Sequence, residues 1–397
     1  MYSLTRLIHR PHRHPLLNGY SALTINYLMM QLSLGMVGMF GVLFLYESGE
    51  GIRKGLGLLL MLLFFVFQRV VIGLMAPFAG WLTEKIGYRR MILLAELFWA
   101  VKLILLAGST NINWLLIPAV VFGGLAISFY YIPFHGLFLD DHVKRKAGEQ
   151  IGTIDMIGQL AAIVSPFAAG LLIDKFNYSI MFILSTILLF ISSVPLFFMR
   201  HHHYKANRKF EITGVSAFFV NNKRLSWALF FWHLEDAVLT FFWPIYLFLI
   251  VKSHTLFGVI GSAVMITSAA VIYLAGRIYD RRPLRRVYPA ATVVVSLAWV
   301  LRFLASTPIA AGMADVLHRL FSPLWWMKIR QKELTAGEKM STVEFGVAHE
   351  LLITAGTILG LVISYWLLVL GGGRWEWLLV PAIGGVIISA KLITWRP

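Results

Sequence analysis

Two short stretches of this sequence repeat each other and decide the fold. Residues 79–91 read AGWLTEKIGYRRM, and residues 275–287 read AGRIYDRRPLRRV. Each copy holds a glycine, then a carboxylate, then an arginine pair. The matched residues are Gly80 with Gly276, Glu84 with Asp280, and Arg89 and Arg90 with Arg285 and Arg286. A motif that recurs in each half of a chain indicates that the two halves are built alike.

The composition places these halves in a membrane. The chain has 397 residues, of which 58% are hydrophobic and only 14% are charged, with a mean hydropathy of +0.75. A soluble domain carries about 25% charged residues. Cysteine is absent, so the sequence holds neither a disulfide framework nor a cysteine metal site.

Twelve apolar segments are long enough to cross a bilayer, which takes about 20 residues of helix. A helix is the expected form because it satisfies its own backbone hydrogen bonds in lipid. The predicted segments are 18–46, 55–82, 90–108, 112–139, 148–173, 178–199, 225–251, 255–278, 286–306, 308–331, 340–370 and 375–394.

A second repeat fixes the relation between the halves. Residues 148–155 read GEQIGTID and residues 337–344 read GEKMSTVE. The matched residues are Gly148, Glu149 and Asp155 in the first copy and Gly337, Glu338 and Glu344 in the second. Because both repeats fall at equivalent loops, the halves have the same orientation. We therefore expect an all-α polytopic membrane protein, with two six-helix bundles related by a pseudo-twofold axis along the membrane normal. The predicted domains are 1–199 and 225–397, with a solvated cytoplasmic linker at 200–224.

The basic residues predict the orientation. Most of the 35 Lys and Arg residues lie in the N-terminal tail and in alternate loops. Cytoplasmic loops collect positive charge, so both termini are expected in the cytoplasm of a plasma membrane protein. The net charge of +16 is thereby explained without a nucleic-acid partner.

The first motif resembles a known signature. The run Gly80-x-Leu82-x-Glu84-Lys85-x-Gly87-Tyr88-Arg89-Arg90 is similar to the Gly-x-Leu-x-Asp-Arg-x-Gly-Arg-Arg pattern between helices 2 and 3 of the major facilitator superfamily. The second copy has Pro283 in place of the second glycine. This resemblance implies a secondary active transporter that moves a small solute by alternating access.

The resemblance also implies a cytoplasmic gate. In the family, such carboxylates and arginines pair across the inner face and hold it closed, which here involves Glu84, Asp280, Arg281 and the two arginine pairs. Simple anchoring of the loops is the alternative interpretation. Glu149 and Glu338 are expected to cap the first turns of their helices. Asp155 and Glu344 are expected about two turns deeper, in a gating or a packing role.

Polar residues inside the apolar segments are the candidates for substrate and ion binding, because they are expensive in a membrane. These candidates are Asn26, Gln31, Gln68, Arg69, Glu235, Asp236, Asp315, His318, Arg319, His349 and Glu350. The family uses helices 1, 4, 7 and 10 to line its cavity, which favours Glu235 or Asp236 as the group that binds a proton. Asp315 and Arg319 are spaced to pair on one helix. Lys102 and Arg302 are expected to extend toward the outer membrane surface.

Other classes of function are disfavoured or remain open. The sequence has no His-Glu-x-x-His, Gly-x-Ser-x-Gly or Walker motif, so an enzyme is not expected. We also expect no cofactor and no metal. The main hypothesis is a monomeric solute transporter coupled to H⁺. A lipid flippase or exporter on the same fold, or a membrane sensor that does not transport, remains an alternative.

Overall fold

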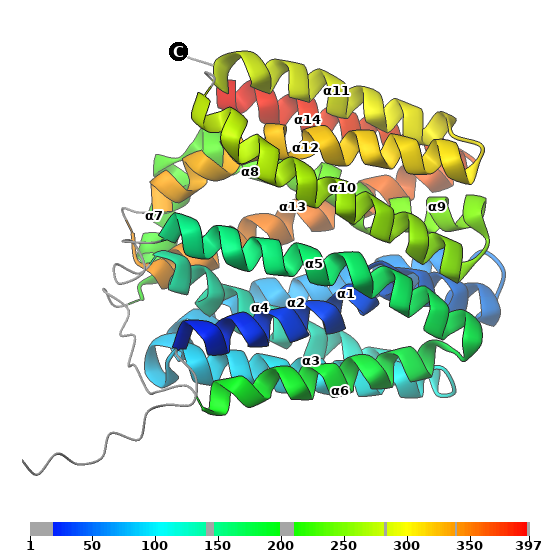
Figure 1. Ribbon diagram of the computed structural model, residues 1–397, viewed down its shortest axis with the longest axis horizontal. Coiled ribbons are helices and arrows are strands. Elements are labelled where there is room, and N and C mark those ends of the chain that lie inside the picture. The colour runs from blue at the N-terminus through cyan, green and yellow to red at the C-terminus, as the bar shows by residue number, and fades with distance from the viewer. Residues whose placement is uncertain (1–18, 140–146, 199–209, 282–283, 338–339, 395–397) are drawn as a thin grey trace, which may run out of the picture.

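The computed structural model describes residues 19–139, 147–198, 210–281, 284–337 and 340–394 (Figure 1). Within these ranges every regular element is helical. The first half contains α1 (Gly19–Ile52), α2 (Gly57–Ile86), α3 (Tyr88–Ser109), η1 (Asn113–Leu115), α4 (Leu116–Leu139), α5 (Ala147–Lys175) and α6 (Tyr178–Phe197). The second half contains α7 (Ile212–Asn221), α8 (Lys223–Ala237), η2 (Val238–Phe242), α9 (Trp243–Val251), α10 (His254–Arg281), α11 (Leu284–Leu304), α12 (Pro308–Gly337), α13 (Thr342–Leu370), η3 (Trp375–Leu378) and α14 (Leu379–Thr394).

The helices match the predicted membrane spans. In the described part of the chain, nine helical segments are long and apolar enough to cross a membrane, and one of them is the continuous run of α8, η2 and α9. Three further helices, α5, α10 and α12, have 29, 28 and 30 residues and are also long enough. Together these segments confirm the predicted twelve-helix architecture.

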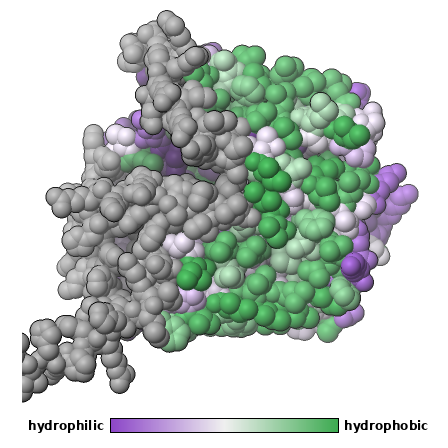
Figure 2. All heavy atoms as spheres, in the orientation of Figure 1, coloured by the Kyte–Doolittle hydropathy of each residue, from purple (hydrophilic) through white to green (hydrophobic). Residues whose placement is uncertain are grey.

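The outer surface of the bundle is apolar, as lipid contact requires. Figure 2 shows hydrophobic residues along the flanks of the helices and hydrophilic residues at the right-hand end, where the short loops lie. Large side chains such as Ile117 and Leu74 are about 70% exposed, at 71% and 68%. Because many helices are apolar toward both the core and the lipid, the sequence alone does not reveal which face of a helix points inward.

The two halves pack against each other mainly through α5 with α10 and through α13 with both α2 and α4. In Figure 1 the first half lies below the second, with α5 beside α10 and α2 beside α13. Glycines allow these close approaches. A Cβ at Gly170 would lie 2.2 Å from the carbonyl oxygen of His254, and one at Gly80 would lie 2.9 Å from Val347. Gly80 thus lets α2 approach α13 closely.

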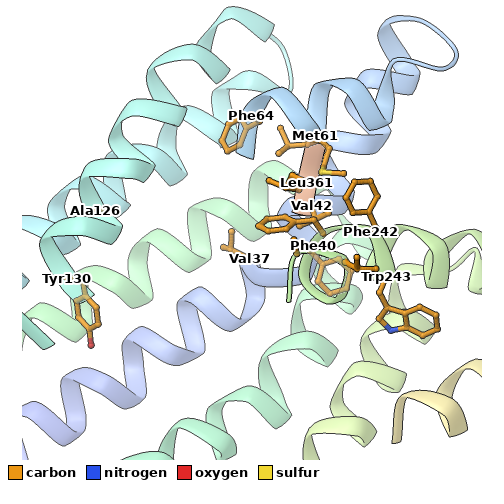
Figure 3. Close-up of a cluster of buried hydrophobic side chains, with 14 of the residues drawn as sticks. Val37, Phe40, Val42, Met61, Phe64, Ala126, Tyr130, Phe242, Trp243 and Leu361 are labelled. Carbon is orange, nitrogen blue, oxygen red and sulfur yellow. The ribbon is translucent and has the colours of Figure 1, made fainter. Parts of the chain in front are cut away.

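A buried apolar cluster joins the halves (Figure 3). Met61 and Phe64 of α2 pack with Val42 of α1, and Phe242 and Leu361 come from the second half. All five side chains are buried. These side chains bring apolar surfaces of both halves together at this level.

The linker is more ordered than predicted. Its described part contains α7, whose side chains Val215 and Phe218 are buried. Glu344 of α13 accepts a hydrogen bond from the backbone N–H of Glu211 at 3.1 Å. The expectation of a solvated loop throughout 200–224 was therefore wrong for this segment, because α7 packs on α13.

Candidate functional site

A deeply buried polar cluster lies among α8, α11 and α12. The carboxylate of Glu235, which is 2% exposed, accepts a hydrogen bond from the indole N–H of Trp299 at 3.1 Å. Its same oxygen lies 3.0 Å from Nε2 of His318. Trp299 and His318 are also fully enclosed. Glu235 is thus held by two donors that can be neutral, which leaves its own charge state open to change.

Arg302 is placed differently from the prediction. It does not extend to the membrane surface: its side chain is 0% exposed and is bonded to Asp315. The guanidinium lies 4.4 Å from the ring centre of Trp299 and 4.9 Å from that of Trp243. Asp315 therefore pairs across to α11 rather than with Arg319 on its own helix. Two aromatic faces and one carboxylate replace the water that a buried guanidinium loses.

A second group of charges faces the junction between the halves. Asp236 lies 3.8 Å from Nδ1 of His233 and accepts a long hydrogen bond from Thr240 at 3.5 Å. Arg69, from the first half, is within electrostatic range of both Asp236 and Glu350. Arg319 is likewise within electrostatic range of both Glu235 and Asp236. The predicted candidates Arg69, Glu235, Asp236, His318, Arg319 and Glu350 are therefore brought together.

The helix that carries Glu235 and Asp236 changes its winding directly after them. Residues Val238–Phe242 form a π-helix between α8 and α9. Such segments are rare inside α-helices and occur often at functional sites. The sequence analysis did not predict this π-helix, and the one nearby residue that could indicate a change in the helix is Pro244, at the start of α9.

Two of the predicted cavity residues, Asn26 and Gln31, lie on α1 and are not part of the charged groups described above. The amide of Asn26 donates to Glu96 and to the carbonyl oxygen of Ser192 at 2.8 Å. Glu96 also accepts from the hydroxyl of Ser192 at 3.2 Å. This network ties α1, α3 and α6 together inside the first half. Gln31 is half-buried on α1, and within the described residues its amide makes no hydrogen bond.

His349 belongs to a separate cluster toward the ends of α12 and α13. Its Nδ1 is bonded to Glu333, which is 0% exposed. Arg330 donates to the other oxygen of Glu333 at 2.8 Å. The sequence analysis did not select Glu333 and Arg330, because Arg330 lies at the very end of the predicted segment 308–331 and Glu333 just beyond it, where charges resemble those of a loop.

The gate motif is described in its first copy only. Arg89 donates to the carbonyl oxygen of Phe197 at 3.0 Å, and Tyr88 lies 3.1 Å from the hydroxyl of Thr342. The second contact joins the halves at this end. Arg90 is exposed, and Gly87 has φ +83°, which a glycine accommodates. The side chains of the second copy, Asp280, Arg281, Arg285 and Arg286, lie outside the described set.

The second repeat caps a helix, although not as predicted. Ser341 and Glu344 form a capping box at the start of α13, so Glu344 lies in the first turn rather than two turns deeper. Glu338 falls outside the described residues. The side chains of Glu149 and Asp155 do as well, but α5 begins at Ala147, which places Glu149 in the first turn.

A further cluster joins the halves at the opposite end. His254, the first residue of α10, lies 2.8 Å from Asp174 of α5 and 3.3 Å from Glu47 of α1. The hydroxyl of Tyr178 donates to Glu47 at 2.6 Å. The backbone N–H of Thr255 donates to Asp174 at 2.8 Å. No group of three or more His, Asp or Glu side chains in the described chain is arranged to hold a metal ion.

The comparisons with known proteins agree with this geometry. The apolar helical bundle with charges buried inside it is that of a polytopic membrane protein. Residues 22–317 match the Major Facilitator Superfamily. The chain belongs to this superfamily, which consists of transporters and not of enzymes, as the sequence predicted.

Curated relatives match part of the chain. The multidrug resistance protein MdtG of Proteus mirabilis is 29% identical over 159 residues, which is 39% of each chain. MdtG of Salmonella dublin is 30% identical over 158 residues, which is 39% of this chain and 38% of the relative. The match thus spans about two fifths of the length of these relatives.

Solved structures match nearly all of the chain in fold. The E. coli fucose:proton symporter FucP has a TM-score of 0.65 at 10% identity and covers 95% of this chain and 98% of its own. The human organic anion transporter MFSD10 has a TM-score of 0.68 at 12% identity, covering 95% and 99%. At these identities the likeness concerns the fold.

Proposed function

We propose that this protein is a secondary transporter that moves a small organic solute across the bacterial plasma membrane by alternating access, coupled to protons. In this proposal it acts as a monomer with both termini in the cytoplasm. Membership of the superfamily and the charged cluster between the halves support the proposal. The name of the MdtG relatives makes drugs the first solutes to test.

The burial of Glu235 is the observation that carries the proposal. An ionised carboxylate at this depth is costly unless a cation compensates it. Arg302, whose guanidinium is fully buried, is already bonded to Asp315. Glu235 instead receives hydrogen bonds from Trp299 and His318. Protonation removes the cost of the buried charge, so a movement that changes access to Glu235 couples proton binding to the transport cycle.

Asp236 is the weaker of the two candidates. Its side chain is 36% exposed, so it is more hydrated than Glu235. It also lies near His233, Arg69 and Arg319, three groups that can stabilise its charged form. We therefore assign the coupling proton to Glu235 and assign Asp236 to the electrostatic environment of the solute.

The test uses Glu235→Gln, which keeps the shape of the side chain and removes its acidity. The solute is first chosen as the compound in a panel of drugs, sugars, amino acids and organic acids that most stabilises the purified protein. In proteoliposomes, the variant should lose accumulation driven by a pH gradient and keep solute exchange at equal pH. Infrared spectroscopy should show a protonated carboxyl band that titrates in the original protein and is missing in the variant.

Asp236→Asn is the matched control and should retain accumulation driven by pH. If Glu235→Gln accumulates solute normally and its infrared spectrum is unchanged, the assignment of the proton to Glu235 is wrong. If neither protein exchanges any solute, the protein is not a transporter of this class of compound.

An apolar groove supports a second candidate, the export of lipids or lipid-like solutes. The groove has a volume of about 1070 Å³ and lies between α10, α11 and α12. Its lining includes Ile260, Leu304 and Met313, and the last two are strongly exposed to the lipid side. A lateral entrance of this kind would admit an acyl chain. Transfer of fluorescent phospholipids between leaflets by the reconstituted protein tests this candidate.

A further inference from the structure

A small cavity at the junction of the halves lies apart from Glu235. It has a volume of about 180 Å³ and is lined by residues of α1, α2, α3 and α4 and by Thr240 and Phe241 of η2. An apolar cavity of about 150 Å³ can hold a benzene ring. The space therefore fits a ligand with one aromatic ring or of similar size.

Two cations line this cavity. Arg69 of α2 and Lys102 of α3 both belong to its wall. Within the described residues Lys102 has no hydrogen bond or ion pair, and its ammonium lies 5.9 Å from the ring centre of Phe64. Arg69 is close enough to interact electrostatically with Lys102, and the two positive charges repel each other. Its position in the sequence had suggested that Lys102 extends to the membrane surface, but its side chain lies in the wall of this cavity instead.

A buried amide accompanies the cations. Gln68 is 3% exposed and also lines the cavity, and its Oε1 has no hydrogen-bond partner. A half-turn of its terminal amide would present the NH₂ group in the same place. Gly123 of α4 makes room for these side chains, because a Cβ there would lie 2.6 Å from Gln68 and 3.0 Å from Lys102.

The walls around the cations are aromatic. Phe64 and Phe65 come from α2, Trp99 from α3 and Phe241 from the second half. No carboxylate belongs to the described lining of this cavity. Lys102 is therefore a cation without a carboxylate beside it, and the carboxylates within electrostatic range of Arg69, Asp236 and Glu350, lie outside this lining. An anionic ligand in the cavity would compensate the charge of Lys102 and would also interact with Arg69.

We propose that this cavity is a binding subsite for a small organic anion, with a carboxylate between Lys102 and Arg69 and an apolar ring among the aromatic side chains. The inference rests on the proposed function, since it assigns the anionic part of the solute to a defined position. The hydroxyl of Thr240 and the amide of Gln68 supply neutral hydrogen bonds to the same carboxylate. Because residues of both halves line the subsite, binding there acts on the contact between them.

Benzoate and benzamide are the test probes, because they share a shape and differ in charge. In thermal unfolding of the purified full-length protein, excess benzoate should raise the midpoint by roughly 2 °C or more, while benzamide should not. Lys102→Met should weaken benzoate binding by about tenfold or more, and Lys102→Arg should largely retain it. Without ligand, Lys102→Met should be at least as stable as the original protein, because it removes an uncompensated charge.

The controls separate this proposal from proton coupling. Lys391→Met removes an exposed lysine of α14 and should leave benzoate binding unchanged. Glu235→Gln should still bind benzoate even though it loses accumulation driven by pH. Equal effects of benzoate and benzamide on the original protein overturn the anion subsite. Benzoate binding that survives in Lys102→Met also overturns it. If Lys102→Met does not fold, benzoate binding that survives in Arg69→Gln has the same meaning.

Discussion

At the scale of single residues, the pairing of Arg302 with Asp315 decides the local stability of the second half. A guanidinium that is 0% exposed depends on its one carboxylate. Asp315→Ala should therefore destabilise the protein strongly, since removal of one partner of a buried ion pair costs about 3–5 kcal/mol. The double variant Arg302→Met with Asp315→Leu should recover most of this loss. Thermal unfolding of the single and double variants measures the difference, and equal midpoints for Asp315→Ala and the original protein would contradict the prediction.

The sequence identified most of these polar residues but not their partners. An ionisable residue within an apolar segment is conspicuous by itself, so Glu235, His318 and Arg319 could be selected without a structure. The bond between Arg302 and Asp315 depends on which faces of α11 and α12 meet. Those helices are apolar toward lipid as well as toward the core, so periodicity does not reveal the facing sides. The spacing of Asp315 and Arg319 therefore suggested a pair that does not form.

At the scale of elements, the contact of α10 with α1 and α5 is expected to close the outer end. His254 reaches Asp174 and Glu47, and its ring packs against Phe248, with centres 4.8 Å apart. His254→Phe should keep the packing and lose both polar contacts. The loss of about 1 kcal/mol at this partly exposed site corresponds to a roughly fivefold shift toward the outward-open state. Distances between spin labels at Lys54→Cys and Arg374→Cys, both exposed in loops that are expected on the outer side, measure this shift.

Tyr178→Phe is the control for the contacts of His254 with Asp174 and Glu47, because it removes one hydrogen bond to Glu47 and leaves His254 in place. Its effect on the label distance should be smaller than that of His254→Phe. An unchanged distance distribution in His254→Phe would show that the cluster does not hold the outer end closed.

Individual helices were predicted well, whereas interruptions of a helix were not. The predicted segment 225–251 corresponds to α8, η2 and α9. The π-helix within it adds a residue to one turn without any glycine or proline among Val238–Phe242. The short helix α7 was also missed, because its stability comes from packing of Val215 and Phe218 on α13 rather than from its own sequence.

At the scale of the whole molecule, the repeats predicted the architecture because each copy marks the same loop of a six-helix unit. We expect residues 1–199 and 225–394 to superpose about an axis along the membrane normal, and an experimental structure would check this. The charges at those loops have a consequence for the cycle. If Glu84 and Asp280 hold the cytoplasmic side closed, their loss should favour the inward-open state.

The double variant Glu84→Ala with Asp280→Ala tests this last prediction. The sequence has no cysteine, so labels at Phe198→Cys, directly after α6, and at Gln331→Cys, in the last two turns of α12, are unique. Each surface pair contributes only about 0–1 kcal/mol, but the two copies act on one equilibrium, so the distance between labels should lengthen in a larger share of molecules. Thermal unfolding should change little, because Gly80 and Val347 maintain the packing of α2 on α13. Anchoring of the loops alone predicts the opposite pattern, in which the protein inserts or folds poorly and the label distances of the folded fraction stay the same.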